Sequence, residues 1–400
     1  MKNSILPKFV MKNNLQKSAQ TGVYFKDIVT NSVLTDICSK ITGQSSFTVE
    51  YVDDDYSDSY LAKGYNRGRL AILHYGGKVH YISFSEKEIG GRNSSVQSVP
   101  TAYNMFYLNP NSSKSIFYYF LNETGNAGTD YQMLIYRLMK TIGFMFLNDV
   151  SALGVSISAF SSIEDIMHTR RANSGKNQSN NSTYVTKSSI RNYDIYGKTY
   201  GANKYETSMI CYALSQLAEP YHLLTLYEVC EGNLIELPKA SLEVISKMNN
   251  IKVIATDMAL EKNVFEENNS LRSPRYIFNL LDRLGNKRCA LCNCEIPELI
   301  QGAHVLPVAA IKKLPAMTLE ERIRQATDGN NGIWLCENHH KMFDQGLLNL
   351  DLDGSVTFKA GIEPQHTAFM NDVTLVKKLP NSILTTEFIM YLDMRNRLAV

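Results

Sequence analysis

Four residues in the C-terminal third of the chain have the types and spacing of metal ligands. Cys289 and Cys292 are separated by two residues, and Cys336 and His339 repeat this spacing further along the chain. Thiolates and an imidazole arranged in two such pairs are typical ligands of a closed tetrahedral zinc site. The sequence therefore predicts that these four residues bind a structural zinc ion. Cys294 is an alternative to Cys292, although a gap of two residues is the more usual spacing.

Three polar residues lie between and beside these zinc ligands. His304 is in the segment GAHVLP, Asn331 is in GNNGIWLC, and His340 directly follows the fourth zinc ligand. An imidazole with a pKa near ~6.5 can take a proton from water at neutral pH. A divalent cation can stabilise negative charge that develops during hydrolysis. Together these residue types suit a general base that works beside a bound divalent metal.

Residues 288–350 resemble the HNH, or ββα-metal, nuclease family through the motifs AHVLP, NGIWLC and HHKMFDQG. The resemblance implies that His304 is the general base, that Asn331 supports the site or binds metal, and that His340 binds metal. It also implies a catalytic Mg²⁺ or Mn²⁺ with Asn331 and His340 as its protein ligands, beside the structural Zn²⁺. Many members carry a paired-cysteine zinc site around this core, which the four predicted zinc ligands match.

One position departs from the family pattern. Many HNH proteins have an acidic metal ligand directly before the base histidine, whereas this chain has Ala303. Asp328 is a candidate substitute. Because His339 and His340 are adjacent, they should point roughly 100° apart on a helix, so that one can face the zinc and the other the catalytic metal.

The surrounding pattern predicts an α+β protein. We expect an N-terminal mixed α/β recognition region followed by a C-terminal ββα-metal HNH domain with a structural zinc. A Gly-Gly turn between two β-rich runs predicts a hairpin over residues 69–84. Helical spacing of apolar residues, with a capping-box pattern in the fourth case, predicts helices over 130–146, 206–217, 240–248, 318–326 and 338–344. The last of these should stop at Gly346.

Composition shifts divide the chain into three ranges. Residues 1–171 form the first, an α+β domain that we expect to recognise DNA. Residues 172–273 contain an Asn-, Ser- and Gly-rich stretch at 172–189 that is typical of a flexible loop, then a basic, tyrosine-rich segment and helical patterns. Residues 274–400 should form the nuclease domain with a C-terminal helix. A second polar stretch, 261–273, marks the main boundary.

Charge and cysteine usage bound the class of protein. The net charge of +2 does not by itself indicate a nucleic-acid partner. We find no apolar run of the ~18 residues that a membrane span requires and no signal peptide. Clustered cysteines without a secretion signal favour metal binding over disulfides, and they predict a reducing cytoplasm. Cys38, Cys211 and Cys230 are interpreted as core thiols.

A basic segment in the middle range is the best candidate for DNA contact. Tyr193, Tyr196 and Tyr200 are interleaved with its lysines and arginine, and two more arginines lie just upstream. Basic side chains pair with phosphates, while tyrosines approach the backbone or bases. The predicted DNA-contacting residues are Lys187, Arg191, Lys198, Lys204, Arg170 and Arg171. A solvated loop with structural tyrosines is the equal alternative.

A large N-terminal region before an HNH core resembles the layout of restriction endonucleases, including those that read modified bases. We therefore predict a restriction-type endonuclease that cuts double-stranded DNA, and a palindromic target would require a homodimer. One alternative is an HNH nicking or recombination-associated enzyme. Others are a nuclease effector toxin and a non-catalytic, zinc-dependent DNA-binding module.

Overall fold

The structure is a computed structural model that describes residues 6–13, 24–52, 70–85, 92–121, 130–148, 156–172, 182–199, 203–229, 237–248, 250–255, 258–267, 273–315 and 317–398. The chain divides into two compact units. Unit 1 comprises residues 1–169, 199–220 and 235–251, and unit 2 comprises 170–198, 221–234 and 252–400. The units are not consecutive, unlike the three ranges expected from composition, because residues 170–251 are shared between them.

Unit 1 contains a six-stranded sheet in the order β2-β1-β3-β4-β5-β6. The strands are β1 (Lys8–Lys12), β2 (Thr48–Val52), β3 (Leu70–Tyr75), β4 (Lys78–Phe84), β5 (Lys114–Tyr119) and β6 (Met145–Phe146). The hairpin predicted from the Gly-Gly turn is confirmed, since β3 and β4 pair antiparallel from Leu70↔Ser83 to Tyr75↔Lys78. Gly76 and Gly77 adopt φ of 56° and 75°, a region that favours glycine.

The helices of unit 1 are α1 (Phe25–Ile28), α2 (Asn31–Thr42), α3 (Arg92–Leu108), α4 (Asp130–Thr141), α5 (Ile163–Ala172), α6 (Asn203–Leu217) and α7 (Lys239–Lys247), of which α5 ends in unit 2. The predicted helices at 206–217 and 240–248 are confirmed as α6 and α7. Helix α4 is shorter than predicted because Gly143 has φ of 95° and the chain then enters β6.

The middle of the chain contributes a four-stranded sheet to unit 2, in the order β10-β9-β8-β7. Its strands are β7 (Thr183–Lys187), β8 (Asn192–Lys198), β9 (Leu223–Val229) and β10 (Ile251–Ala255). Strands β7 and β8 are antiparallel, and β8 and β9 are parallel. The expected flexible loop over 172–189 is therefore wrong for residues 183–187, which are a strand, while 173–181 lie outside the described residues.

The rest of unit 2 carries the ββα motif, which confirms the α+β class. Its strands are β11 (Ile300–His304), β12 (Gly332–Cys336), β13 (Leu348–Leu350) and β14 (Val356–Phe358). Its helices are α8 (Met258–Glu267), α9 (Pro274–Leu284), η2 (Pro297–Leu299), α10 (Val308–Lys312), α11 (Leu319–Thr327), η3 (Gly329–Asn331), α12 (Glu337–Asp344), α13 (Pro364–Val373) and α14 (Thr386–Leu398). The predicted capping box of α11 and the stop of α12 at Gly346, with φ of 62°, are both present.

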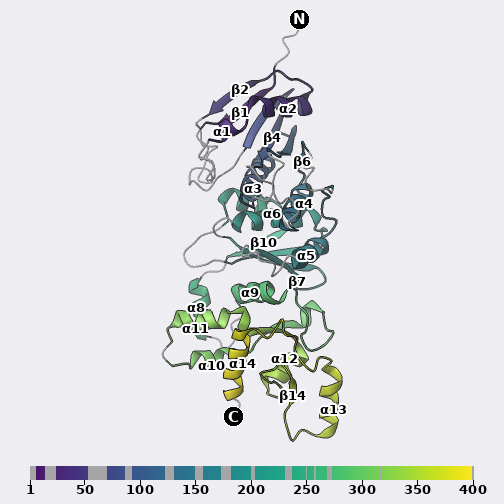
Figure 1. Ribbon diagram of the computed structural model, residues 1–400, viewed down its shortest axis with the longest axis vertical. Helices are drawn as coiled ribbons and strands as arrows, with labels where there is room; N and C mark the ends of the chain where they lie inside the picture. The colour runs from purple at the N-terminus through teal and green to yellow at the C-terminus, as the bar shows by residue number, and fades with distance from the viewer. Residues whose placement is uncertain are drawn as a thin grey trace. The chain divides into compact units, whose positions relative to one another are not determined.

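Helix α9 lies between the four-stranded sheet and the ββα motif (Figure 1). On the sheet side, the rings of Phe278 and Tyr184 meet edge to face at 5.1 Å. On the other side, Tyr276 and Leu280 pack against the antiparallel strands β11 and β12 at Gly302 and Gly332. A Cβ at Gly332 would lie 2.4 Å from the Tyr276 Oη, so the missing side chain is what permits this close approach.

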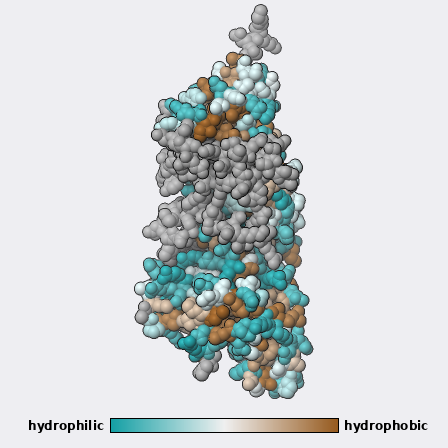
Figure 2. Space-filling model, in the orientation of Figure 1, coloured by the Kyte–Doolittle hydropathy of each residue, from teal (hydrophilic) through white to brown (hydrophobic). Residues whose placement is uncertain are grey.

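The hydrophobic core of unit 2 joins the sheet, α9 and the ββα motif in one cluster that includes Tyr196, Val229 and Trp334. The face drawn in Figure 2 shows hydrophilic and hydrophobic patches alternating over the lower part of the molecule. Among the described residues, no helix is both long enough and apolar enough to cross a membrane.

Candidate metal centre and active site

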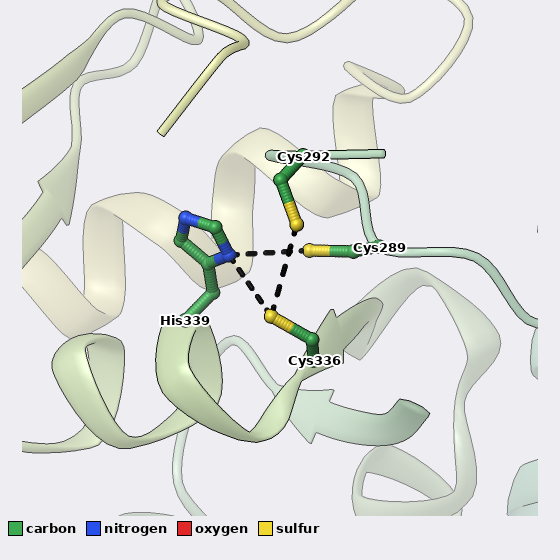
Figure 3. Close-up of side chains that lie close together, drawn as sticks. All are labelled: Cys289, Cys292, Cys336 and His339. Carbon is green, nitrogen blue, oxygen red and sulfur yellow. Dashed lines mark hydrogen bonds between the residues drawn. The ribbon is translucent and has the colours of Figure 1, made fainter. Parts of the chain in front are cut away.

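The predicted zinc ligands converge on one point. Cys289 and Cys292 come from the loop after α9, Cys336 ends β12, and His339 lies in the first turn of α12. Their ligand atoms all lie within 4.8 Å of one another, and the side chains point toward a common centre (Figure 3). The cluster contains Cys292 and not the alternative Cys294, whose carbonyl accepts a hydrogen bond from the Cys289 amide at 2.9 Å.

The separations of the ligand atoms fit a zinc ion. Tetrahedral zinc with ordinary bond lengths places two sulfurs about 3.8 Å apart and a sulfur and a nitrogen about 3.6 Å apart. The Cys292 and Cys336 sulfurs are 3.8 Å apart. The His339 Nδ1 lies 3.4 Å from the Cys289 sulfur and 3.1 Å from the Cys336 sulfur. The residues therefore fit the group in both donor chemistry and spacing.

The surroundings of the cluster explain how a cation is held. Burial raises the pKa of the Cys289 thiol to about 12, so a bound ion must displace its proton. Burial also lowers the pKa of His339, which favours the neutral ligand form. The His339 Nε2 lies 3.1 Å from the buried Thr374 hydroxyl, a partner that fixes the ring with Nδ1 toward the cluster.

His304 is the last residue of β11, and two neighbours orient its ring. The ring stacks on Tyr276 of α9 with centroids 4.1 Å apart and planes 8° apart. Its Nε2 lies 2.9 Å from the Ala326 carbonyl oxygen at the end of α11. A carbonyl oxygen only accepts hydrogen bonds, so Nε2 carries a proton. In the neutral ring the unprotonated nitrogen is therefore Nδ1.

Asn331 is fully buried and bonded to the backbone that follows His304. Its Oδ1 accepts from the Leu306 amide at 2.7 Å, and its Nδ2 donates to the Leu306 carbonyl at 3.1 Å. The same Nδ2 lies 3.3 Å from the Gln325 carbonyl. The Asn331 backbone carbonyl also accepts from the Val305 amide at 3.0 Å. Both ends of the side chain are thus engaged in holding the segment beyond β11.

His340 faces away from the zinc cluster, as the helical geometry predicts. Its Nδ1 lies 3.1 Å from the Gln301 Oε1 in β11, three residues before His304. Its Nε2 lies 3.3 Å from an Asp344 carboxylate oxygen one turn later in α12. Alternate residues of a strand point to opposite faces, so Gln301 faces α12 whereas His304 faces α9.

Neither Ala303 nor Asp328 supplies a carboxylate that could bind a metal beside His304. Ala303 is fully buried. Asp328 caps the turn of η3, since its Oδ1 accepts from the Asn330 amide at 2.8 Å and its Oδ2 accepts from the Tyr391 hydroxyl at 3.0 Å. The structure instead places the Asp344 carboxylate beside His340. A spacing of four residues on one helix is the sequence signal that could have identified Asp344.

The expected DNA-contacting residues divide into exposed and buried ones. Arg170 is only 2% exposed, and its Nε donates to the Thr183 carbonyl at 2.9 Å, so it supports the β7 strand instead of facing solvent. Tyr193 and Tyr196 are also buried, against the expectation that they approach DNA. Arg191 is exposed and lies over the Tyr221 ring.

The remaining basic residues of that set are partly exposed. Lys187, Lys198 and Lys204 are half-buried over the rings of Tyr193, Phe278 and Tyr205, respectively. The side chain of Arg171 and the whole of Tyr200 lie outside the described residues. The segment is thus mainly a structural hairpin with a few basic side chains at its surface.

The candidate zinc cluster and the ββα motif lie in one continuous part of the chain. A family model described as HNH endonuclease matches residues 289–351. This segment, which includes all four zinc ligands, His304, Asn331, His340 and Asp344, is an HNH domain. A comparison with curated proteins finds no match.

Proposed function

We propose that the chain is a restriction-type DNA endonuclease in which His304 is the general base and His340 holds one divalent metal. The orientation of His304 is the observation that carries this proposal. The Ala326 carbonyl fixes the proton on Nε2, which leaves Nδ1 as the basic nitrogen. Stacking on Tyr276 restricts rotation of the ring, so the basic nitrogen keeps one direction. A general base held in one tautomer and one orientation suits proton abstraction from water.

In the proposed reaction, a water molecule gives a proton to Nδ1 of His304 while its oxygen attacks the phosphorus of a DNA phosphodiester. The bond between phosphorus and the leaving oxygen breaks, and that oxygen takes a proton from solvent. The Ala326 carbonyl favours the protonated imidazole that forms, because the Nε2–H bond to an acceptor strengthens when the ring becomes charged. The HNH assignment of the domain supports the phosphodiester as substrate.

We infer that Asp344 supplies the carboxylate that Ala303 lacks. Oxygens of Gln301 and Asp344 face Nδ1 and Nε2 of His340, respectively, so a metal ion bound by Nε2 beside the Asp344 carboxylate would take the place of a proton on that nitrogen. A nitrogen and a carboxylate oxygen side by side suit Mg²⁺ or Mn²⁺, which complete their shells with water and phosphate oxygens. When bound, such an ion would stabilise the negative charge that develops on the phosphate and the leaving oxygen.

For Asn331, the two expected roles were support of the site and metal binding. We propose the first. The amide already makes hydrogen bonds at both ends, and binding a metal through Oδ1 would leave the buried Leu306 amide without its partner. Asn331 then acts by fixing the chain that leaves His304.

Selection of the DNA target is proposed for the N-terminal part of the chain, in line with a restriction-type layout. The exposed Arg191 and the half-buried Lys187 are the strongest of the predicted phosphate contacts that the structure describes. A homodimer would cut both strands of a palindromic site. The proposed partner is therefore double-stranded DNA bound by two copies of the chain.

Cleavage of supercoiled plasmid with Mg²⁺ tests the proposal. Wild type should convert it to linear or nicked products, His304→Ala should bind the DNA but cut it at least about 100-fold more slowly, and His366→Ala, an exposed histidine in α13, should cut normally. Wild-type rates from His304→Ala would refute the assigned base.

The products separate the remaining classes. Linear DNA with defined ends favours a restriction-type enzyme, and accumulation of nicked circles favours a nicking or recombination-associated enzyme. If wild type and His304→Ala bind equally and neither cuts, the chain is a DNA-binding module.

A further inference from the structure

The C-terminal helix α14 lies outside the segment that matches the HNH family, yet it is hydrogen-bonded to the residue after β11, to α12 and to β13. The Tyr391 hydroxyl donates to Asp328 at 3.0 Å, at the turn that leads to Asn331. The Asn396 amide donates to the Leu350 carbonyl of β13 at 3.0 Å. Between these contacts, Arg395 reaches into the module. The helix, drawn in yellow at the end of the chain in Figure 1, is therefore part of the nuclease fold.

The Arg395 guanidinium connects the two elements that carry the proposed chemistry. Its NH1 donates to the Val305 carbonyl at 3.0 Å, and its NH2 donates to the Phe343 carbonyl. Its carbon lies 3.6 Å above the centre of the Phe343 ring. Val305 directly follows His304 at the end of β11. Phe343 lies between His340 and Asp344 in α12.

A guanidinium has its donors in a rigid plane, so two carbonyls bonded to it are held at a fixed separation. The Phe343 carbonyl is in the last turn of α12, where it also accepts a hydrogen bond from the Gly346 amide at 3.1 Å. Stacking on Phe343 fixes the plane of the guanidinium as well as its position. One side chain thus restrains both the spacing and the relative orientation of β11 and α12.

We propose that Arg395 is a positioning residue, which holds the strand that ends in the base His304 at a fixed distance from the helix that carries the metal ligands His340 and Asp344. This inference rests on the proposed function. Arg395 does not touch the substrate. It acts because proton abstraction and metal-assisted departure of the leaving oxygen occur on one phosphate, so the base and the metal must keep a set separation.

The test compares Arg395→Lys with wild type and with Arg397→Lys. Lysine keeps the charge and the stem but cannot form two fixed hydrogen bonds in one plane. Arg397 lies in the same helix, is exposed and pairs with Asp393, so its substitution is a matched control. Three properties are measured: single-turnover cleavage at saturating DNA, Mn²⁺ binding by electron paramagnetic resonance without DNA, and emission of Trp334.

For Arg395→Lys we expect cleavage to slow by a factor on the order of 10 to 100, the usual sensitivity to a misplacement near about 1 Å. Mn²⁺ binding should stay close to that of wild type, because His340 and Asp344 share one helix and keep their own spacing. Trp334 emission should also be unchanged, which excludes a loss of fold. Amide hydrogen exchange should increase at the ends of β11 and α12.

Several results would overturn the inference. Wild-type cleavage by Arg395→Lys would do so, as would a slow variant whose rate per folded molecule, counted by Trp334 emission, equals that of wild type. Loss of Mn²⁺ binding in parallel with cleavage would assign Arg395 to the metal site instead. If Arg395→Lys does not fold, Arg395→Gln replaces it under the same criteria. A wild-type protein that fails to cut would refute the proposed function, and the inference with it.

Discussion

Replacing Asn331 by aspartate distinguishes the two roles that the sequence allowed for this residue. Asn331→Asp keeps the shape of the side chain and exchanges the Nδ2 amide group for a second oxygen. In the structure that group faces the carbonyl oxygens of Leu306 and Gln325 at 3.1 and 3.3 Å. A carboxylate there would place oxygen against two oxygens in a fully buried site. A catalytic metal ligand, by contrast, would tolerate aspartate well, since hard cations prefer carboxylate oxygens.

The magnitude follows from the bonds that are lost. A hydrogen bond contributes about 1 kcal/mol, and a buried polar group left without a partner costs about 1–3 kcal/mol. Loss of both Nδ2 bonds therefore lowers the free energy of unfolding by about 2–4 kcal/mol in Asn331→Asp. That is a large part of the roughly 5–15 kcal/mol that stabilises an ordinary domain. We expect cleavage to fall at every Mg²⁺ concentration, because the segment after His304 loses its support.

The assay uses Trp334, the single tryptophan of the chain, which is buried in β12 beside the site. Its emission during urea unfolding reports on the nuclease module without a contribution from unit 1. Asn371→Asp, at an exposed position of α13, adds the same charge and serves as the control. An Asn331→Asp protein with the urea midpoint of wild type and an unchanged or lower Mg²⁺ requirement would refute the positioning role and restore Asn331 as a metal ligand.

Two further predictions concern the zinc cluster and the pH dependence of unit 1. Removing zinc with a chelator should shift Trp334 emission to the red and unfold the nuclease module, because the cluster ties the loop after α9 to β12 and α12; unchanged emission in metal-free protein would contradict this. Burial would raise the pKa of Asp165, but hydrogen bonds from Arg137 and Ser161 outweigh it and lower that pKa below 3.8. The folded state then binds the proton more weakly than the unfolded state, so this stabilisation is complete above pH 3.8 and is lost as pH falls through the folded-state pKa. Asp165→Asn should therefore lower the free energy of unfolding by about 1 kcal/mol at pH 7, and by progressively less in acid. Hydrogen exchange of the α5 amides measures this difference. A difference between the variant and wild type that does not vary with pH would contradict the prediction.

The ligands of the zinc site could be predicted from the sequence because their spacing carries the geometry. Two residues between Cys289 and Cys292 define a tight turn, and Cys336 to His339 spans the start of a helix. The capping box at Thr318 and the glycine after α12 were equally local signals. Such features depend on residues a few positions apart, so they can be recognised without knowledge of the tertiary fold.

The middle of the chain could not be predicted in the same way. Tyr184 lies in strand β7, Tyr193 and Tyr196 lie three residues apart in β8, and all three are buried by packing of the sheet. Basic and aromatic residues at these spacings suit a DNA-facing loop or a hairpin equally well. What decides between them is the pairing of β8 with β9, a strand that follows only after α6. That pairing has no local signal.

The surroundings of His304 extend this argument to the boundaries of the nuclease. The residue itself was found from its motif, but its ring is oriented by Tyr276 before the matched segment and by the Ala326 carbonyl within it. Thr374, beyond the matched segment, fixes the zinc ligand His339. A motif can specify a base and its metal ligands, since these must have particular side chains. It cannot specify their supports, because a stacked ring, a hydroxyl or a backbone carbonyl can come from any element that packs there. The residues of the proposed chemistry therefore lie in a short segment, while the groups that orient them are distributed from α9 to the C-terminal helices.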